Sequence, residues 1–116
     1  MPIFKFLING YLFEIEIVLN RNNISIQGKT NINNIIYNCI LSLKDLHNKD
    51  KFFQRSNSLN EAYEIFLNSF NCNNAFIKEI NNSGIIIGIK EQNEDILFFL
   101  KSNSYNNNNN TLKPYY

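Results

Sequence analysis

The alternation of hydrophobic and polar residues predicts a β-hairpin at the start of the chain. Residues 3–8 and 11–19 are rich in Ile, Leu and Phe, and the second segment alternates apolar residues with two glutamates. Such alternation is typical of a strand with one buried and one partly solvated face. Asn9-Gly10 between the segments favours a tight hairpin turn, because both residues tolerate positive φ.

Two more strands are expected before the helical period begins. Residues 24–27 begin the third strand, with Ile24 and Ile26 pointing inward, and Gly28 marks either a bulge or the strand end. After a loop at 31–34, residues 35–41 are predicted to form the fourth strand.

The period then changes to that of a helix. Ser42 and Asp45 are suited to the N-cap and first turn of a short helix that ends near Asn48. Ser58 and Glu61 have the spacing of a capping box. Beyond them, six apolar residues fall on one helical face. They are Leu59, Ala62, Tyr63, Phe66, Leu67 and Phe70.

The C-terminal third reads as a meander of three strands, over 75–80, 85–90 and 96–101. The sequence therefore predicts one α+β, mainly-β domain over residues 1–101. Its expected core is an antiparallel sheet or small sandwich of about seven strands, with a two-helix insert between strands four and five. Residues 102–116 are Asn-rich and lack apolar periodicity, so we expect a disordered tail there.

Composition supports a single domain and adds little about function. A chain of 116 residues with 44% hydrophobic residues can bury a core without disulfides or metal. Charged residues make up only 18%, against a usual share of about 25%, and asparagine supplies much of the remaining polarity. Asn, Ile, Phe, Tyr and Lys share AT-rich codons, which explains this bias without a functional role.

The charge pattern argues against nucleic-acid binding through a basic face. The formal net charge is +1, and the basic residues between 44 and 55 are interleaved with Asp45 and Asp50. No apolar stretch reaches the roughly 20 residues that span a bilayer. The N-terminus does not read as a signal peptide, and the two cysteines suit free thiols. A cytoplasmic location is expected.

Single residues offer little chemistry. We expect His47 to be an exposed surface residue, and Cys39 to be a small buried hydrophobe rather than a nucleophile. Cys72 could be exposed and reactive. Glu14 and Glu16 are expected on the solvated side of a strand. We therefore predict no catalytic, cofactor-binding or metal-binding residue.

Two C-terminal strands carry more apolar residues than one buried face requires. Residues 85–89 and 96–100 are apolar at positions that point to both sides of a sheet. Either the chain covers both faces itself, or the surplus is a protein interface. Phe52-Phe53 raises the same question, and we expect one ring in the core and the other at an interface. The candidate interface residues are Phe52, Phe53, Ile85, Ile87, Ile96, Phe98 and Phe99.

The order of elements resembles a known family. The pattern from Ile36–Leu46 into Ser58–Phe70, within Ile3–Lys101, is similar in layout to the globular head domain of the centriolar cartwheel scaffold and of the end-joining DNA-repair scaffolds. The resemblance implies a non-catalytic scaffold. Those heads are followed by a dimerising coiled coil, whereas residues 102–116 have no heptads, so the resemblance implies a head alone or a truncated or divergent member.

The expected function is a non-catalytic protein–protein interaction or scaffold module. It would bind a protein partner, or itself, through an apolar sheet face or a strand edge. One alternative is a small structural subunit of a large assembly, such as a ribosomal or organellar complex. Another is a small enzyme, which would require His47 close to Cys72 or to a buried carboxylate.

Overall fold

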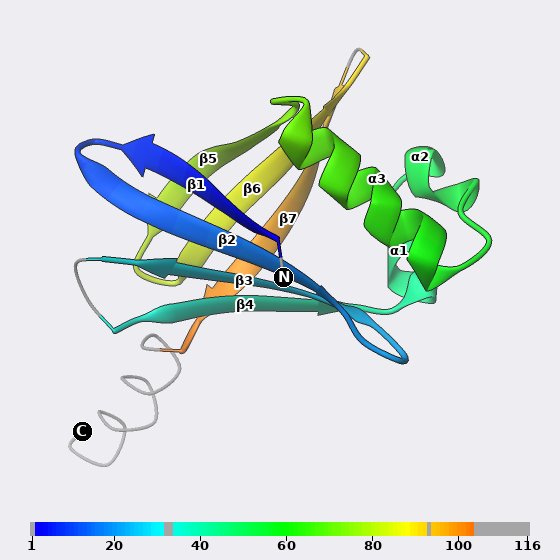
Figure 1. The fold of residues 1–116 in the computed structure, drawn as a ribbon, viewed down its shortest axis with the longest axis horizontal. Coiled ribbons are helices and arrows are strands. Elements are labelled where there is room, and N and C mark those ends of the chain that lie inside the picture. The colour runs from blue at the N-terminus through cyan, green and yellow to red at the C-terminus, as the bar shows by residue number, and fades with distance from the viewer. Residues whose placement is uncertain (1, 32–33, 93, 104–116) are drawn as a thin grey trace.

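The computed structural model describes residues 2–31, 34–92 and 94–103, and these form a single seven-stranded antiparallel sheet with three helices (Figure 1). The strand order is β1-β2-β3-β4-β7-β6-β5. The strands are β1 (Ile3–Ile8), β2 (Tyr11–Leu19), β3 (Ile24–Thr30), β4 (Ile36–Leu41), β5 (Ala75–Asn81), β6 (Gly84–Glu91) and β7 (Glu94–Ser102). The helices are α1 (Leu43–Lys49), α2 (Lys51–Gln54) and α3 (Leu59–Asn71).

The predicted fold class, a mainly-β α+β domain with a helical insert after the fourth strand, is confirmed. Of the two arrangements expected, the structure adopts one nearly closed sheet. The sheet is continuous because β4 pairs with β7, through Tyr37 with Ser102 and Asn38 with Lys101. Figure 1 shows the sheet curving around its inner face, with α3 lying across the opening.

The insert contains one more short helix than the sequence predicted. Asp50 ends α1 and caps α2, where its carboxylate accepts a hydrogen bond from Phe52 N at 2.9 Å. Four residues are too few to show a helical period, so hydrophobic patterning gave no signal for α2.

The predicted helix starts are found at Ser42 and Ser58. Ser42 Oγ accepts from Asp45 N at 3.0 Å while Ser42 N donates to Asp45 Oδ2 at 2.9 Å, which completes a capping box. Ser58 Oγ accepts from Glu61 N at 3.2 Å. The Glu61 carboxylate accepts instead from Asn57 N, one residue before the cap.

Several strand boundaries differ from the sequence prediction, among them those at Gly28 and Ser102. Gly28 is neither a bulge nor a strand end, because β3 continues in register to Thr30. The bulge lies in β5, between Ile77 and Glu79. Ser102, expected to begin the tail, is the buried last residue of β7. The rest of the predicted tail, from residue 104 on, lies outside the described residues.

Aromatic rings from the insert fill the space inside the sheet. Phe53 and Phe66 lie 5.2 Å apart by ring centroid, and Phe98 of β7 is 5.9 Å and 5.3 Å from them. At the other end of α3, Phe70 lies 4.8 Å from Phe4 of β1. The insert therefore covers the inner face and joins β1 to the C-terminal strands.

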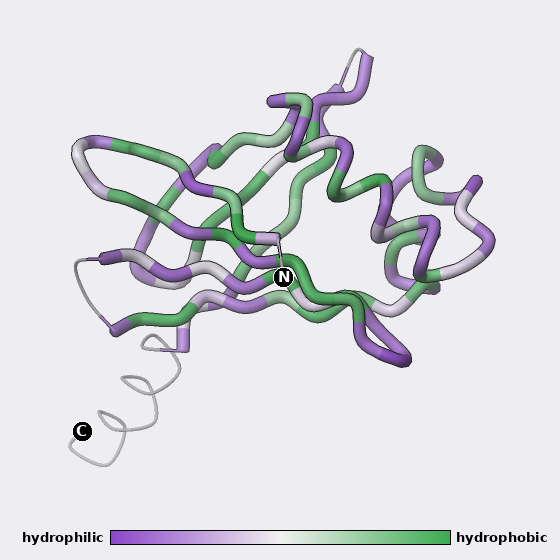
Figure 2. The backbone as a smooth tube through the Cα atoms, in the orientation of Figure 1, coloured by the Kyte–Doolittle hydropathy of each residue, from purple (hydrophilic) through white to green (hydrophobic). Residues whose placement is uncertain are grey.

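Hydropathy follows this architecture. Figure 2 shows hydrophobic segments along the strands and hydrophilic ones at the turns. No helix among the described residues is long and apolar enough to cross a membrane.

Candidate interaction surface

Most of the candidate interface residues lie in the core, so they cannot form a surface in this structure. Five side chains are at most 3% exposed, because four of them point to the inner face of the sheet and the fifth, from the helical insert, packs over that face. These are Phe53, Ile85, Ile87, Ile96 and Phe98. The apolar cover expected for one face of β6 and β7 is therefore internal.

The other two candidates are accessible. Phe52 is half-buried, and the guanidinium of Arg55 lies 4.3 Å from its ring centroid. The two adjacent phenylalanines thus point in different directions, with Phe53 in the core. Phe99 is 45% exposed, on the outer face of β7.

Phe99 belongs to an apolar area on the outer face of β5, β6 and β7. Ile86 is its register partner on β6, and Leu97 precedes it by two residues on the same strand. Phe76 of β5 lies opposite Gly88, beside Leu97. We call Phe76, Ile86, Leu97 and Phe99 the outer apolar patch.

Sequence reasoning missed three of these four residues. It recognised that β6 and β7 are apolar on both faces, but the residues it selected were mainly those of the inner face. Side chains alternate along a strand, so Ile86 and Leu97 point to the face opposite that of Ile85 and Ile96. This alternation could have identified them as residues of the outer face.

Two glycines of β6 shape the patch. The ring of Phe76 lies over Gly88, and the ring of Phe99 lies beside Gly84, in space that a Cβ would need. Aromatic rings that pack over strand glycines cover backbone that would otherwise face water. Two aromatic rings and two aliphatic side chains therefore form the surface of the patch.

Charged residues of both signs border the patch. Lys90 and Asp95 are exposed register partners at one end, and Lys90 Nζ lies 5.8 Å from the Phe76 ring centroid. Lys101 is exposed at the other end of β7, and Glu79 is exposed on β5. The two positive and two negative charges of these four residues cancel.

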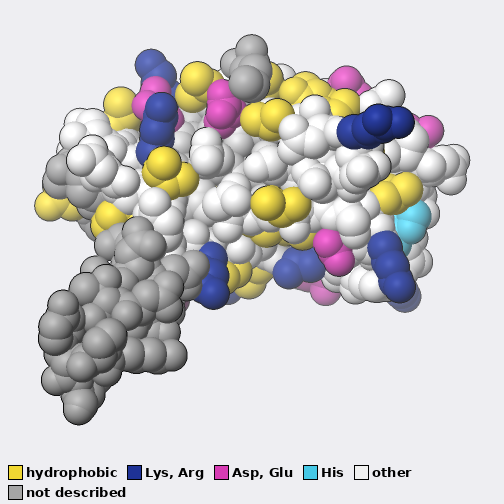
Figure 3. Space-filling model, turned by 90° about the horizontal axis from the view of Figure 1, so that it is seen from below, with side chains coloured by type: hydrophobic (Ala, Val, Ile, Leu, Met, Phe, Trp, Pro, Cys, Tyr) yellow, Lys and Arg dark blue, Asp and Glu magenta, His cyan; other side chains and the backbone are white. Residues whose placement is uncertain are grey.

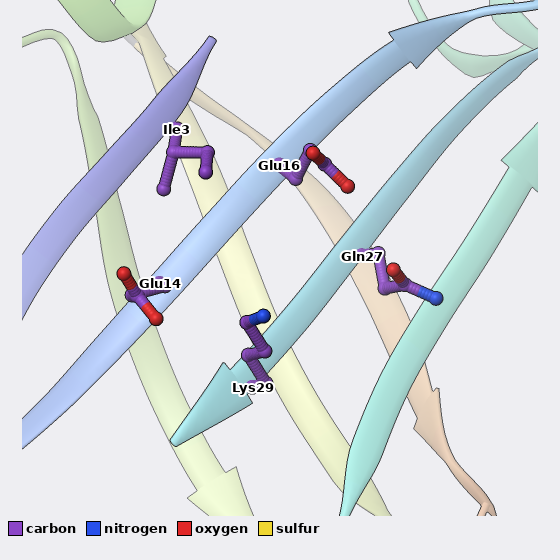
Figure 4. A pocket seen from close by; sticks show the side chains of 5 residues that line it. All are labelled: Ile3, Glu14, Glu16, Gln27 and Lys29. Atoms are coloured by element: carbon purple, nitrogen blue, oxygen red, sulfur yellow. The ribbon is translucent and has the colours of Figure 1, made fainter. Parts of the chain in front are cut away.

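The outer face of β1, β2 and β3 is mixed, because Ile3 and Leu7 are 48% and 76% exposed on it beside charged residues. Glu14 lies between Lys5 and Lys29 in register. A hollow of about 30 Å³ opens here, lined by Ile3, Glu14, Glu16, Gln27 and Lys29 (Figure 4). This volume holds about one or two water molecules. Glu14 and Glu16 are half-buried on this outer face, opposite the buried residues of β2.

His47 is more buried than expected. Its Nε2 lies 2.7 Å from the carbonyl oxygen of Ser56, and the ring is half-buried. An N–H donated to a carbonyl joins α1 to the segment before α3, which is a structural role. Ser56 Oγ is buried and has no hydrogen-bond partner among the described residues.

The cysteines differ in exposure. Cys39 is half-buried in β4, and burial raises the pKa of its thiol, partly opposed by the charge of Lys49. Cys72 is exposed at the end of α3. The described residues contain no group of three or more His, Cys, Asp or Glu side chains that could hold a metal ion.

One further face has no concentrated charge. Figure 3 shows Lys and Arg side chains spread singly among acidic and hydrophobic ones, with the histidine at one end of the molecule.

Comparison with family models, curated proteins and solved structures finds no match to the chain.

Proposed function

We propose that this chain is a non-catalytic protein-interaction module that binds a protein partner through the outer apolar patch. The observation that carries the proposal is Phe99. It is 45% exposed in the middle of a regular strand, with apolar Ile86 opposite it and apolar Leu97 beside it. A sheet with one covered face ordinarily carries polar residues on the other.

The patch has the chemistry of a binding surface. Aromatic side chains supply large contact areas and dominate the energetics of many interfaces. Phe76 packs over Gly88 and Phe99 beside Gly84, so both rings already lie against the backbone of β6. A preorganised surface loses less side-chain entropy when a partner binds.

Two weaker lines of support accompany this one. The chain has four strands, a helical insert and three strands. We propose a scaffold role because this order resembles that of the scaffold head domains named above. The free cysteines suit a reducing compartment, so we propose the cytoplasm as the location.

The test is affinity capture from the native source with a matched pair of variants. Phe99→Ser removes the centre of the patch. Ile40→Ser is the control, because Ile40 is 58% exposed on the outer face of β4 but lies opposite Ser25. We expect wild type and Ile40→Ser to retain the same protein, which can be another chain or this one, and Phe99→Ser to lose it. Equal capture by all three proteins would contradict the proposal.

A further inference from the structure

The outward residues of β7 form a row that is complementary to itself when reversed. Asp95, Leu97, Phe99 and Lys101 succeed one another at every second position. Read in one direction the row is acidic, apolar, apolar, basic, and read in the other it is basic, apolar, apolar, acidic. Resting on the proposed function, we propose that the partner of the outer apolar patch is a second copy of this chain, with β7 antiparallel to β7 of the first.

A two-fold axis accounts for this arrangement. The row is centred on Phe98, whose register partner Ile87 is also the centre of the outward β6 row from Gly84 to Lys90. Consider a two-fold axis at this level that lies in the interface plane and runs perpendicular to the strands. It places β7 of the second copy over β7 of the first, and β6 over β6, with each strand running in the opposite direction. Such an axis gives an isologous contact, in which the same patch is used by both copies.

This axis pairs unlike groups along β7. It places Asp95 of one copy over Lys101 of the other, and Leu97 over Phe99. An axis parallel to the strands would instead place Asp95 over Asp95 and Lys101 over Lys101, and like charges in contact are destabilising. The charges therefore select the antiparallel dimer.

Lys101 provides the second argument. Its two register partners within the sheet, Gly84 and Asn38, are uncharged, whereas Asp95 lies opposite Lys90. The carboxylate of Asp95 from a second copy gives Lys101 an acidic neighbour, which neither of its register partners provides. With a formal net charge of +1, the two chains repel one another only weakly.

The dimensions permit the contact and indicate its strength. Sheets pack face to face about 10 Å apart, with strands crossing at about 30°. The row from residue 95 to 101 is about 20 Å long. If two such rows cross at their centres at about 30°, the end of one row is displaced sideways by about 5 Å from the end of the other, a distance that a lysine side chain can span. Three strands about 4.8 Å apart present a face well below the roughly 800 Å² per partner of stable complexes. The dimer is accordingly a weak one.

The experiment is sedimentation equilibrium of the purified full chain at micromolar concentrations, with charge reversal at one or both ends of the row. Lys101→Glu places a carboxylate opposite Asp95 of the second copy, and we expect the dissociation constant to rise by about tenfold or more. Asp95→Lys combined with Lys101→Glu reverses both ends and is expected to restore the dimer. Lys29→Glu, an equal charge change at an exposed position of β3 away from the patch, is expected to leave it unchanged. Circular dichroism confirms that each variant is folded.

The outcomes separate this inference from the proposed function. A purified chain that stays monomeric, while lysate capture still depends on Phe99, overturns the dimer and leaves the interaction module standing. A dimer that Lys101→Glu does not weaken, or that the double reversal does not restore, overturns the antiparallel arrangement. Lysate capture that does not depend on Phe99 overturns the proposed function as well.

Discussion

The ring of Phe76 covers Gly88 so closely that a Cβ at position 88 would collide with it. At Gly84 the obstacle is different, because a Cβ there would meet the backbone carbonyl of Leu100 as well as the Phe99 ring. A half-buried ring can swing toward solvent, whereas a carbonyl in a paired strand cannot move alone.

We therefore expect Gly84→Ala to lower the free energy of unfolding by roughly 1–3 kcal/mol, as overpacking does, and Gly88→Ala to lower it by less. Urea denaturation of the two variants beside wild type measures both. A larger loss for Gly88→Ala would show that the Phe76 ring is more firmly held than its exposure indicates.

The adjacent phenylalanines of α2 provide a second test. Phe53 is fully buried among Phe66 and Phe98, so Phe53→Ala leaves a cavity and is expected to cost about 3–5 kcal/mol. Phe52 is half-buried under Arg55, so Phe52→Ala is expected to cost clearly less. Thermal and urea unfolding of the pair check the difference, and similar losses would contradict the assignment of Phe53 alone to the core.

Asp45 predicts a dependence of stability on pH. The hydrogen bond from the Ser42 backbone N–H, followed by the one from its hydroxyl, lowers the pKa of this carboxyl below its ordinary value. A lowered pKa in the folded state means that the ionised group stabilises the fold above the unfolded-state pKa, about 3.9, and that this contribution is lost as pH falls through the folded value.

The stability difference between wild type and Asp45→Ala should then be constant near neutral pH, shrink below about pH 4 and reach its minimum under the folded-state pKa. Denaturation curves across this range measure it. Ser42→Ala keeps the backbone donor and should retain part of the effect. A difference that grows on acidification would reverse the assigned sign.

Thiol labelling distinguishes the cysteines. Cys72 is exposed, whereas Cys39 is half-buried and its pKa is raised, which reduces the reactive thiolate at neutral pH. An aromatic disulfide reagent should modify one thiol of the folded chain quickly and the second at least about tenfold more slowly, with the gap narrowing as pH rises. Mass spectrometry identifies the site. In Cys72→Ser the fast phase should disappear, and its persistence would be inconsistent with the structure.

The local elements could be predicted because their signals are local. Asn9-Gly10 adopts positive φ at both residues, as the turn requires, and Asn73 does so just after α3. The α3 stripe and both serine caps follow from spacing along the chain. The pairing of β4 with β7 has no such signal, because it depends on contacts between residues far apart in sequence. The single turn α2 was too short to detect.

The interaction surface was predictable only in outline. Apolar residues on both faces of β6 and β7 indicated surplus apolar surface. The sequence alone did not show that the insert covers the face that contains Ile87 and leaves the face that contains Phe99 exposed. The partial burial of His47 likewise depends on a carbonyl nine positions away along the chain.

The short junction between β4 and β7 has a consequence for folding. Two register pairs join these strands in the described part of the chain, whereas neighbouring strands elsewhere pair along most of their length through short connections. Each meander is rich in local contacts, and closing the junction requires a loop of more than 60 residues, whose entropy must be lost first. We therefore expect the two meanders to form early, the junction to close in the rate-limiting step, and amide protons there to exchange before those of the strands on either side.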